Sequence, residues 1–353
     1  MRAMNSEEHG DRPQKLEVRT IILFAIGIFV LFLIVQIVGT SEILPVLLNM
    51  DHYYLLLLLG FQILSVATWN LRWNLFVNKL EKVSYFSIMP MLLAGILINN
   101  ITPGPSIGGQ PITAYYLKKK TKNPFSECFA TLVMDMSVQA FAFAVFGVFS
   151  ILYVFLYVSS EAIRLLVGIL VFLDLMIVFI IVFLAKNSRN EKIWSILSPF
   201  LKLIHYSKIL SQLNEFESYN DAKDYVINQI ENLKETVREL LQFKKVLLAA
   251  CMLALSMFFL EYVKVYTAFL GLGYSVSFVH VVVVTSISST VGYFVFMPGG
   301  TGAVETAMVA LYFELGIPLG IATTATLLSR LLFYLTTYGA GYVSLSYLNL
   351  KWT

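Results

Sequence analysis

The chain has 353 residues, of which 58% are hydrophobic and only 13% are charged, whereas a soluble globular protein carries roughly 25% charged residues. This composition excludes a soluble domain. The 25 Lys and Arg against 22 Asp and Glu give a net charge of +3, which is too balanced for a nucleic-acid-binding protein. Cys128 and Cys251 lie far apart in apolar stretches, so they predict neither a disulfide framework nor a metal or redox site.

Eight apolar stretches are candidate membrane segments, because a span needs about 20 mostly apolar residues. In chain order they cover residues 20–38, 53–71, 84–117, 125–158, 162–185, 245–270, 276–315 and 319–349. Residues 1–19 are polar and are predicted to form a cytoplasmic tail. No small-residue cleavage site follows the run at 20–38, so this run is predicted to be a membrane helix rather than a cleaved signal peptide.

Two long stretches without charge, residues 83–117 and 265–304, are interrupted by proline and glycine. The first contains a Pro/Gly-rich run from Thr102 to Pro111, and the second contains Met297-Pro298-Gly299-Gly300-Thr301-Gly302. Proline and glycine at this density end a helix. Each stretch is therefore predicted to be two shorter helices joined by a break.

The placement of lysine and arginine predicts the topology, because short cytoplasmic loops are enriched in them. The cations that decide it are Arg2, Arg12, Lys15, Arg19, Arg72, Lys79, Lys82, Lys118, Lys119, Lys120, Lys122 and Lys351. With both ends inside, the segment 84–117 is predicted to be a re-entrant hairpin. With Lys351 also inside, 276–315 is predicted to be a second hairpin that enters from the outside. Both termini are then on the cytoplasmic side of the cell (plasma) membrane.

The predicted fold is an all-α polytopic membrane protein with about six full transmembrane helices and two Pro/Gly-broken re-entrant hairpins in an inverted repeat. The halves are residues 20–185 and 245–350, joined by a cytoplasmic linker at 186–244. Such repeats are a transporter architecture, and the helix breaks mark the binding site. The alternative is that each hairpin is two short crossing helices joined by an ordinary loop.

Within the linker, residues 219–243 carry apolar side chains at spacings of three and four, which predicts an amphipathic helix. We expect this helix to lie along the cytoplasmic surface or to cover a helix end. The linker is too short for a catalytic domain, because a hydrophobic core needs on the order of 100 residues.

The two breaks are candidate anion sites. Each precedes a helix start, with Pro111 suited to the first helical position and Gly302 to the cap, and a helix N-terminus offers free N–H groups and a partial positive charge. The alternative is that the glycines serve only close helix packing. The predicted substrate-binding residues at the breaks are Thr102, Pro103, Gly104, Gly108, Gly109, Gln110, Pro298, Gly299, Gly300 and Gly302.

Charged residues inside apolar runs are costly and are the second group of candidates. Arg330 is interpreted either as the cation that receives an anionic headgroup or as the structural partner of Glu305, Glu314 or Asp174. The two interpretations are compatible if the anion displaces a carboxylate. Glu305 itself either stabilises the helix start through the dipole or is the protonatable group of a coupled transporter.

The remaining intramembrane charges have open roles. Asp135 and Asp174 are each a proton-coupling candidate or a hydrogen-bonded interior carboxylate. Glu261 and Lys264 are one turn apart and are predicted to pair on one helix face. Arg72, between two tryptophans, is interpreted as a snorkelling interface anchor.

Motifs for chemistry are not evident in the sequence. It contains no GxxxxGK[ST] loop, no HExxH spacing and no Gly-x-Ser-x-Gly elbow. We therefore expect no ATP motor, no metal site, no cofactor and no enzyme activity.

The sequence resembles the membrane proteins related to the transmembrane, flippase-like region of lysylphosphatidylglycerol synthase. The resemblance lies in PGGTGAVE at 298–305, the Gly-Ile-Pro turn at 316–318, SRLLFY at 329–334 and the Thr102 to Pro111 element with Tyr115 and Tyr116, and it extends to Arg72-Trp73. The resemblance adds Arg72 and Tyr334 to the predicted substrate-binding residues, which already include Arg330 and Glu305. The chain departs from the family in having Asp135-Met136 and Gln139 where a charge cluster is common, and Val304 where an arginine is common.

The resemblance implies a protein that handles lipids without synthase activity, since only four residues follow Asn349 and leave no room for an aminoacyltransferase domain. The leading hypothesis is a flippase-like transporter that moves an anionic lipid headgroup, on a phospholipid or linked through polyprenyl phosphate. Its transport is either downhill or coupled to an ion gradient, for which protons are the candidate. The alternative is a non-transporting accessory protein that binds a lipid-linked intermediate for a separate glycosyltransferase or lipid synthase. A membrane-embedded transferase or hydrolase is disfavoured, because no nucleophile and base pair is recognisable.

Overall fold

The computed structural model describes residues 50–102, 108–157, single residues between 161 and 176, 219–295 and 297–352. Every element in these residues is a helix. The predicted membrane helix at 20–38, most of the one at 162–185 and the candidate Asp174 lie outside the described residues.

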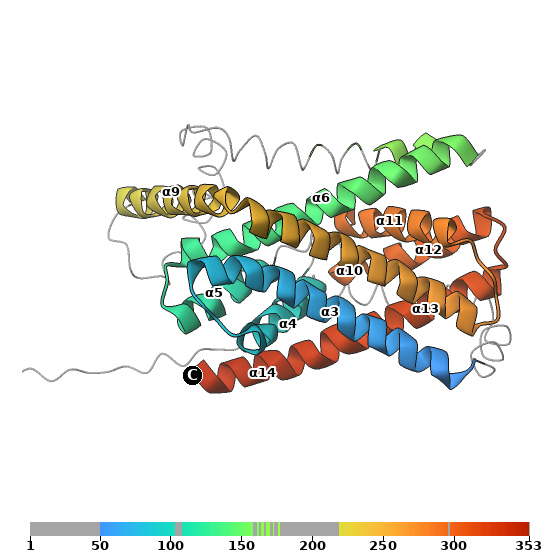
Figure 1. Cartoon of the computed structure of the whole chain (residues 1–353), viewed down its shortest axis with the longest axis horizontal. Coiled ribbons are helices and arrows are strands. Elements are labelled where there is room, and N and C mark those ends of the chain that lie inside the picture. Colours follow the sequence, from blue (N-terminus) through green and yellow to red (C-terminus); the bar gives the residue numbers. More distant parts are fainter. Residues whose placement is uncertain are drawn as a thin grey trace, which may run out of the picture.

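The described helices fall into two groups along the chain (Figure 1). The first group is α3 His52–Leu80, α4 Tyr85–Ile101, α5 Gly109–Thr121 and α6 Phe125–Tyr157. The second group is α9 Tyr219–Gln242, α10 Lys244–Gly271, α11 Phe278–Phe294, the 3-10 turn η2 Pro298–Gly300, α12 Ala303–Glu314, α13 Leu319–Tyr334, the π-helical η3 Leu335–Ala340 and α14 Gly341–Trp352. The helices α13, η3 and α14 follow one another without a break and form one long helix, Leu319–Trp352.

Within the described residues, four helices are long and apolar enough to cross a membrane, namely α3, α6, α10 and Leu319–Trp352. The distribution of side chains fits a lipid environment. Leu56, Leu156 and Leu350 are 70%, 72% and 86% exposed, whereas Arg72 and Lys264 are 0% and 1% exposed. A soluble protein has the opposite arrangement, because buried charge is unfavourable and exposed apolar surface is limited. The chain is therefore a multi-pass membrane protein.

The two groups of helices repeat one another. Helices α3, α4, α5 and α6 have 29, 17, 13 and 33 residues, and α10, α11, α12 and Leu319–Trp352 have 28, 17, 12 and 34. The first residues of matching helices are 192 to 194 positions apart along the whole series. This constant offset shows that each half contains one long helix, one hairpin and a second long helix.

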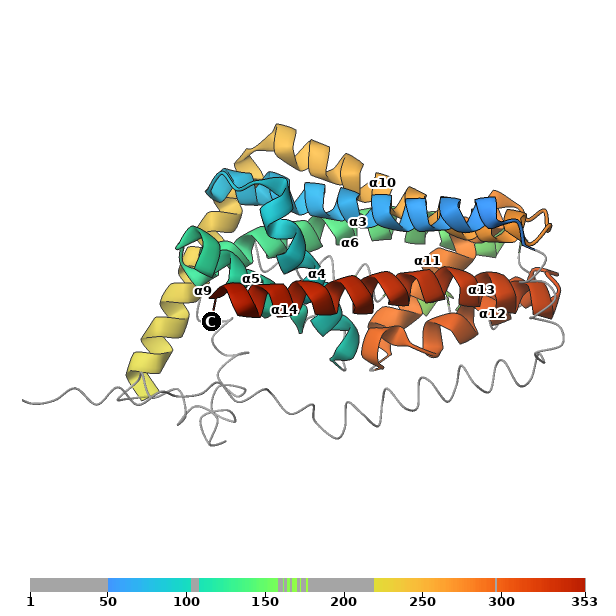
Figure 2. The ribbon, with the colours of Figure 1, turned by 90° about the horizontal axis from the view of Figure 1, so that it is seen from below.

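The second half runs in the opposite direction to the first. In Figures 1 and 2, α3 and α10 lie side by side and run in opposite directions along the long axis, and α6 runs opposite to the α13 to α14 helix. The two hairpins enter the bundle from opposite ends, and their tips lie near the middle of its length (Figure 2). Whether these hairpins are re-entrant in a bilayer belongs to the proposal below.

The first hairpin is held closed by glycine. Its arms, α4 and α5, touch where a Cβ on Gly109 would lie 1.9 Å from the carbonyl oxygen of Gly95. The Thr113 hydroxyl of α5 lies at the same contact and donates to the Met91 carbonyl of α4 at 3.3 Å. No side chain fits between backbones at this distance, so glycine at both positions is a packing requirement here.

The second hairpin reverses direction through glycines with left-handed backbone. Gly299, Gly300 and Gly302 have φ of 61°, 67° and 87°, a region that side chains rarely adopt. Gly300 also sits against Gly292 of α11, where a Cβ would lie 3.1 Å from the Gly292 Cα. The run of glycine in this break thus serves both the turn and the close packing of η2 against α11.

The helix that the linker periodicity predicts over 219–243 is α9. It lies across one end of the bundle and is steeply inclined to the other helices (Figure 2). Val237 and Leu240 on its apolar face are buried together with Phe76, Ala130 and Met134. Its apolar face therefore covers the ends of α3 and α6.

The Gly95–Gly109 contact predicts a large effect of one methyl group. Gly109→Ala is expected to lower the free energy of unfolding by about 1 to 3 kcal/mol, because the added Cβ overlaps the Gly95 carbonyl. Gly60→Ala is the matched control, since nothing lies within 4 Å of a Cβ at that helical position. Thermal unfolding in detergent measures both variants, and an equal melting temperature for the two would contradict the packing described.

Candidate functional site

An ion pair on the second hairpin forms the centre of the candidate site. Arg330 Nε of α13 lies 2.6 Å from Glu305 Oε1 of α12, and their side chains are 15% and 0% exposed. The second oxygen of the same carboxylate accepts a hydrogen bond from the Gly302 N–H at 2.7 Å. Glu305 thus joins the start of α12 to the cation of α13. This arrangement combines the predicted helix-start role of Glu305 with the predicted pairing of Arg330.

Tyrosine and the hairpin break complete the surroundings of the pair. Tyr334 donates to Glu305 Oε1 at 2.7 Å and accepts from Arg330 Nη2 at 3.0 Å. Nη2 also donates to the Gly299 carbonyl at 3.3 Å. Thr301 lies 3.2 Å from the Tyr334 hydroxyl. The guanidinium is therefore fixed by three different elements, η2, α12 and α13. We call these five residues the Arg330 cluster.

The tip of the first hairpin touches this cluster. A Cβ on Gly299 would lie 3.3 Å from Asn100 Oδ1, and Tyr338, one turn after Tyr334, donates to the Asn100 carbonyl at 3.3 Å. Asn100 is 6% exposed, and its Nδ2 has no hydrogen-bond partner within the described residues. The two breaks that the sequence predicts as one site therefore meet in space.

Both helix N-termini at the breaks already have an acceptor within the protein. The Gly109 N–H at the start of α5 donates to Asn99 Oδ1 at 2.6 Å, and the Gly302 N–H donates to Glu305. Gly302 is the cap of α12, as predicted. The prediction that Pro111 takes the first helical position was wrong, because α5 begins at Gly109 and the proline is the third residue, where its missing N–H also has no helical partner.

The other predicted residues of the breaks lie at the ends of α4 and α5, in η2, or outside the described residues. Thr102 caps α4 and donates to the Ile98 carbonyl at 2.7 Å, and Gly108 precedes α5, with Gln110 in its first turn. Pro298 and Gly300 are buried in η2. Pro103 and Gly104 lie outside the described residues.

Arg72 belongs to a different cluster between α3, α6 and α10. Its Nε and Nη2 bind the two carboxylate oxygens of Asp135 at 2.6 and 2.9 Å, and Nη2 also donates to Gln139 at 2.9 Å. Trp69 donates to the same carboxylate at 3.0 Å. The interpretation of Arg72 as a snorkelling anchor was wrong. Its side chain is 0% exposed, because its carboxylate partner Asp135 lies inside the bundle.

The repeat places a second buried cation at the matching position. Lys264 of α10 stands 192 positions after Arg72 of α3 and is 1% exposed. It binds Glu261 at 2.7 Å, as predicted, and donates to Gln62 of α3 at 2.7 Å. Each of the paired long helices α3 and α10 therefore holds one interior cation with a carboxylate partner.

Sequence reasoning did not identify several residues of the Arg330 cluster and its neighbourhood. Asn100 lies in the last turn of α4, just before the first break, and Tyr338 follows Tyr334 by one helical turn. A polar side chain in a long uncharged membrane run was the available signal for Asn100, and the i, i+4 spacing was the signal for Tyr338. Thr301 carried no signal beyond its place among the glycines.

Comparison with known proteins gives a match over most of the chain. Residues 20–341 match the family model described as the lysylphosphatidylglycerol synthase TM region. A UPF0104 membrane protein of Pyrococcus horikoshii is 27% identical over 91% of this chain and 95% of its own length. A UPF0104 membrane protein of Methanocaldococcus jannaschii is 29% identical over 94% of this chain and 95% of its own length.

The Arg72 cluster predicts a large stability effect from an isosteric change. Asp135→Asn leaves the fully buried Arg72 without its anion, and is expected to lower the free energy of unfolding by about 3 to 5 kcal/mol. Glu314→Gln, at an exposed carboxylate of α12, is the control and should change it by less than about 0.5 kcal/mol. Denaturant titration in mixed micelles measures the free energy of unfolding of both variants. Equal effects would show that Arg72 does not need its partner.

Proposed function

Because the chain belongs to the family of the lysylphosphatidylglycerol synthase transmembrane region, we propose that it is a flippase-like transporter for a lipid with an anionic headgroup. The lipid is a phospholipid or a polyprenyl-phosphate-linked molecule, whose tail stays in the bilayer while the headgroup passes between the hairpin tips. The observation that carries the proposal is the buried Arg330–Glu305 pair at the point where the two tips meet.

Arg330 has the chemistry of an anion receptor. Two of its nitrogens make the described hydrogen bonds, and the side chain retains 15% exposure. A guanidinium binds phosphate or carboxylate in a bidentate manner through adjacent N–H groups. An incoming phosphate would replace Glu305 and Tyr334 as acceptors, so the headgroup takes over the cation that Glu305 neutralises in its absence.

The first hairpin supplies a further donor. Asn100 Nδ2 is buried, and among the described residues it has no acceptor. A buried donor without a partner costs about 1 to 3 kcal/mol, which a ligand oxygen would recover. Asn100 and Arg330 come from opposite repeats, so a headgroup bound to both would contact both hairpins at once.

The architecture supplies a route across the membrane. The two hairpins enter from opposite ends of the bundle (Figure 2), and we propose that both are re-entrant, with six full helices around them. Backbone breaks at membrane depth are tolerated where they line a wet cavity. In inverted repeats, alternate movement of the two halves exposes such a central site first to one side and then to the other.

Charge supports an orientation with both termini in the cytoplasm of a cell membrane. One end of the bundle carries the ends of α3, α5 and α14 and the starts of α6 and α10 (Figure 1). Nine lysines lie at these helix ends or in the loops directly beside them, namely Lys79, Lys82, Lys118, Lys119, Lys120, Lys122, Lys244, Lys245 and Lys351. Lysine marks cytoplasmic loops.

Proton coupling is assigned to Glu305. Protonation of Glu305 would release Arg330 for the headgroup, because the neutral acid no longer neutralises the guanidinium. Asp135 is a weaker candidate, since it pairs with Arg72 in a cluster that does not include the hairpin tips. The accessory-protein alternative requires α9 as a docking surface, and the burial of Val237 and Leu240 against the bundle does not favour it.

Transport is predicted to depend on Arg330. In liposomes that carry the purified protein, Arg330→Gln should slow the movement of labelled phosphatidylglycerol or polyprenyl phosphate at least about tenfold, because hydrogen bonds to a charged group contribute about 1.5 to 3 kcal/mol. The double variant Arg330→Gln/Glu305→Gln leaves no unpaired buried charge and should be folded and equally inactive. Lys245→Gln removes an exposed cation and serves as the control. Normal transport by the folded double variant would exclude the anion site.

The coupling role predicts a different result for Glu305 alone. Glu305→Gln keeps Arg330 in place and removes the group that exchanges a proton. Lipid movement should persist, and its response to an imposed pH gradient should disappear. The rate of lipid movement in the same liposomes, measured with and without a pH gradient, tests this expectation. A variant that still responds to the gradient would place the coupling elsewhere.

A further inference from the structure

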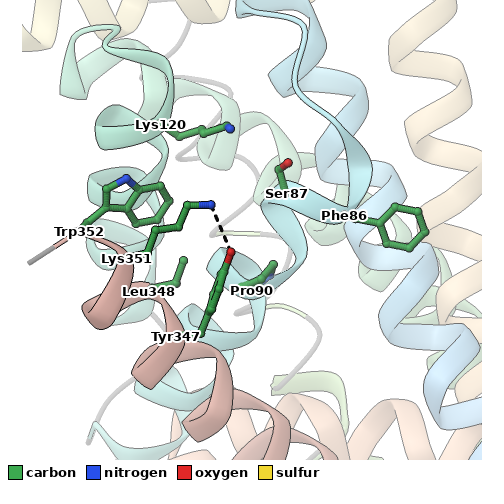
Figure 3. A pocket seen from close by; sticks show the side chains of 8 residues that line it. All are labelled: Phe86, Ser87, Pro90, Lys120, Tyr347, Leu348, Lys351 and Trp352. Carbon is green, nitrogen blue, oxygen red and sulfur yellow. Dashed lines mark hydrogen bonds between the residues drawn. The ribbon is translucent and has the colours of Figure 1, made fainter.

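A cavity lies at the lysine-rich end of the bundle, between α4, α5 and α14. It has a volume of about 250 Å³ and is lined by Phe86, Ser87, Pro90, Lys120, Tyr347, Leu348, Lys351 and Trp352. In Figure 3 the ends of Lys120 and Lys351 and the hydroxyl of Ser87 point toward the space between these helices, whereas the ring of Phe86 points away from it. We call this cavity the terminal pocket.

The terminal pocket is electropositive. Its charged lining residues are Lys120 and Lys351, and none of the three ion pairs among the described residues involves them. The Lys351 ammonium donates to the Tyr347 hydroxyl at 3.2 Å (Figure 3). This hydrogen bond holds the ammonium at the pocket. Two cations without a carboxylate in the lining attract an anion.

The walls of the pocket are fixed before any ligand binds. Tyr116 of α5 stacks on Trp352 of α14 with ring centroids 5.7 Å apart, and its hydroxyl donates to Asn349. Lys119 donates to the Trp352 carbonyl at 3.0 Å. The ends of α5 and α14 are therefore tied together beside Lys120 and Lys351, so little ordering is needed on binding.

The surroundings of the pocket suit a lipid better than a free ion. Phe86 and Tyr347 are 79% and 49% exposed beside the opening, and aromatic side chains together with lysine are typical of the membrane–water interface. Basic pockets between membrane helices at the cytoplasmic surface bind the headgroups of anionic lipids. The exposed rings can contact acyl chains while the lysines contact phosphate.

From this geometry we propose that the terminal pocket binds the phosphate of an anionic phospholipid of the surrounding leaflet, held by Lys120 and Lys351. The pocket is separate from the Arg330 cluster: Arg330 and Lys351 are 21 positions apart on one continuous helix, which corresponds to about 30 Å at 1.5 Å per residue. The inference therefore does not rest on the proposed transport function.

Lipid binding to the purified full chain in detergent tests this assignment, with native mass spectrometry as the readout. Phosphatidylglycerol is the probe, phosphatidylcholine is the neutral comparison and inorganic phosphate is the competing free ion. The double variant Lys120→Gln/Lys351→Gln should weaken phosphatidylglycerol binding about tenfold or more, because each lysine near an anionic lipid contributes about 1 kcal/mol. Lys120→Arg/Lys351→Arg should retain the affinity.

The matched control removes the same charge at the same end of the bundle. Lys82→Gln/Lys122→Gln changes two exposed lysines that do not line the pocket, and binding should stay within about twofold of the unaltered protein. An equal loss in the control, equal affinity for phosphatidylcholine, or displacement of the lipid by millimolar inorganic phosphate would each overturn the proposal.

Discussion

The need to neutralise charge inside the membrane determines the architecture of this protein. An ionised side chain in a low-dielectric interior must have a partner of opposite charge or a set of hydrogen bonds. Arg330, Arg72 and Lys264 each meet this requirement, with Glu305, Asp135 and Glu261 respectively. Of these pairs, the one between Arg330 and Glu305 is distinguished by its position, because it lies where the two hairpin tips touch.

That position follows from the repeat. Two copies of the order helix, hairpin, helix run in opposite directions, so the tips of their hairpins come together near the middle of the bundle (Figure 2). Glycine makes the meeting possible, since Gly109 lets the arms of the first hairpin touch and Gly299 allows the second to turn against Asn100. The same glycines bring together a fixed cation and an amide donor that has no partner among the described residues. The proposed anion site rests on this arrangement.

Much of this fold is predictable from the sequence, because membrane segments carry strong signals. The breaks at Pro103 to Pro111 and Pro298 to Gly302 predict two hairpins, and the structure has a pair of packed helices at each. The partners of the buried charges were harder to predict. Arg330 had three candidate carboxylates, and only packing selects Glu305. Arg72 was misinterpreted because Asp135 lies 63 positions away, and nothing in the local sequence shows that the two side chains meet.

The contact between the hairpin tips is the central claim, and a disulfide between them tests it most directly. A Cβ at residue 299 would lie 3.5 Å from the Asn100 Cβ, within the usual range for a disulfide. In a chain whose Cys128 and Cys251 are replaced by alanine, Asn100→Cys/Gly299→Cys should form this bond under mild oxidation, and lipid movement should be slower in the oxidised than in the reduced form of this same variant. Failure of the two cysteines to join in the folded, membrane-embedded protein would contradict the account.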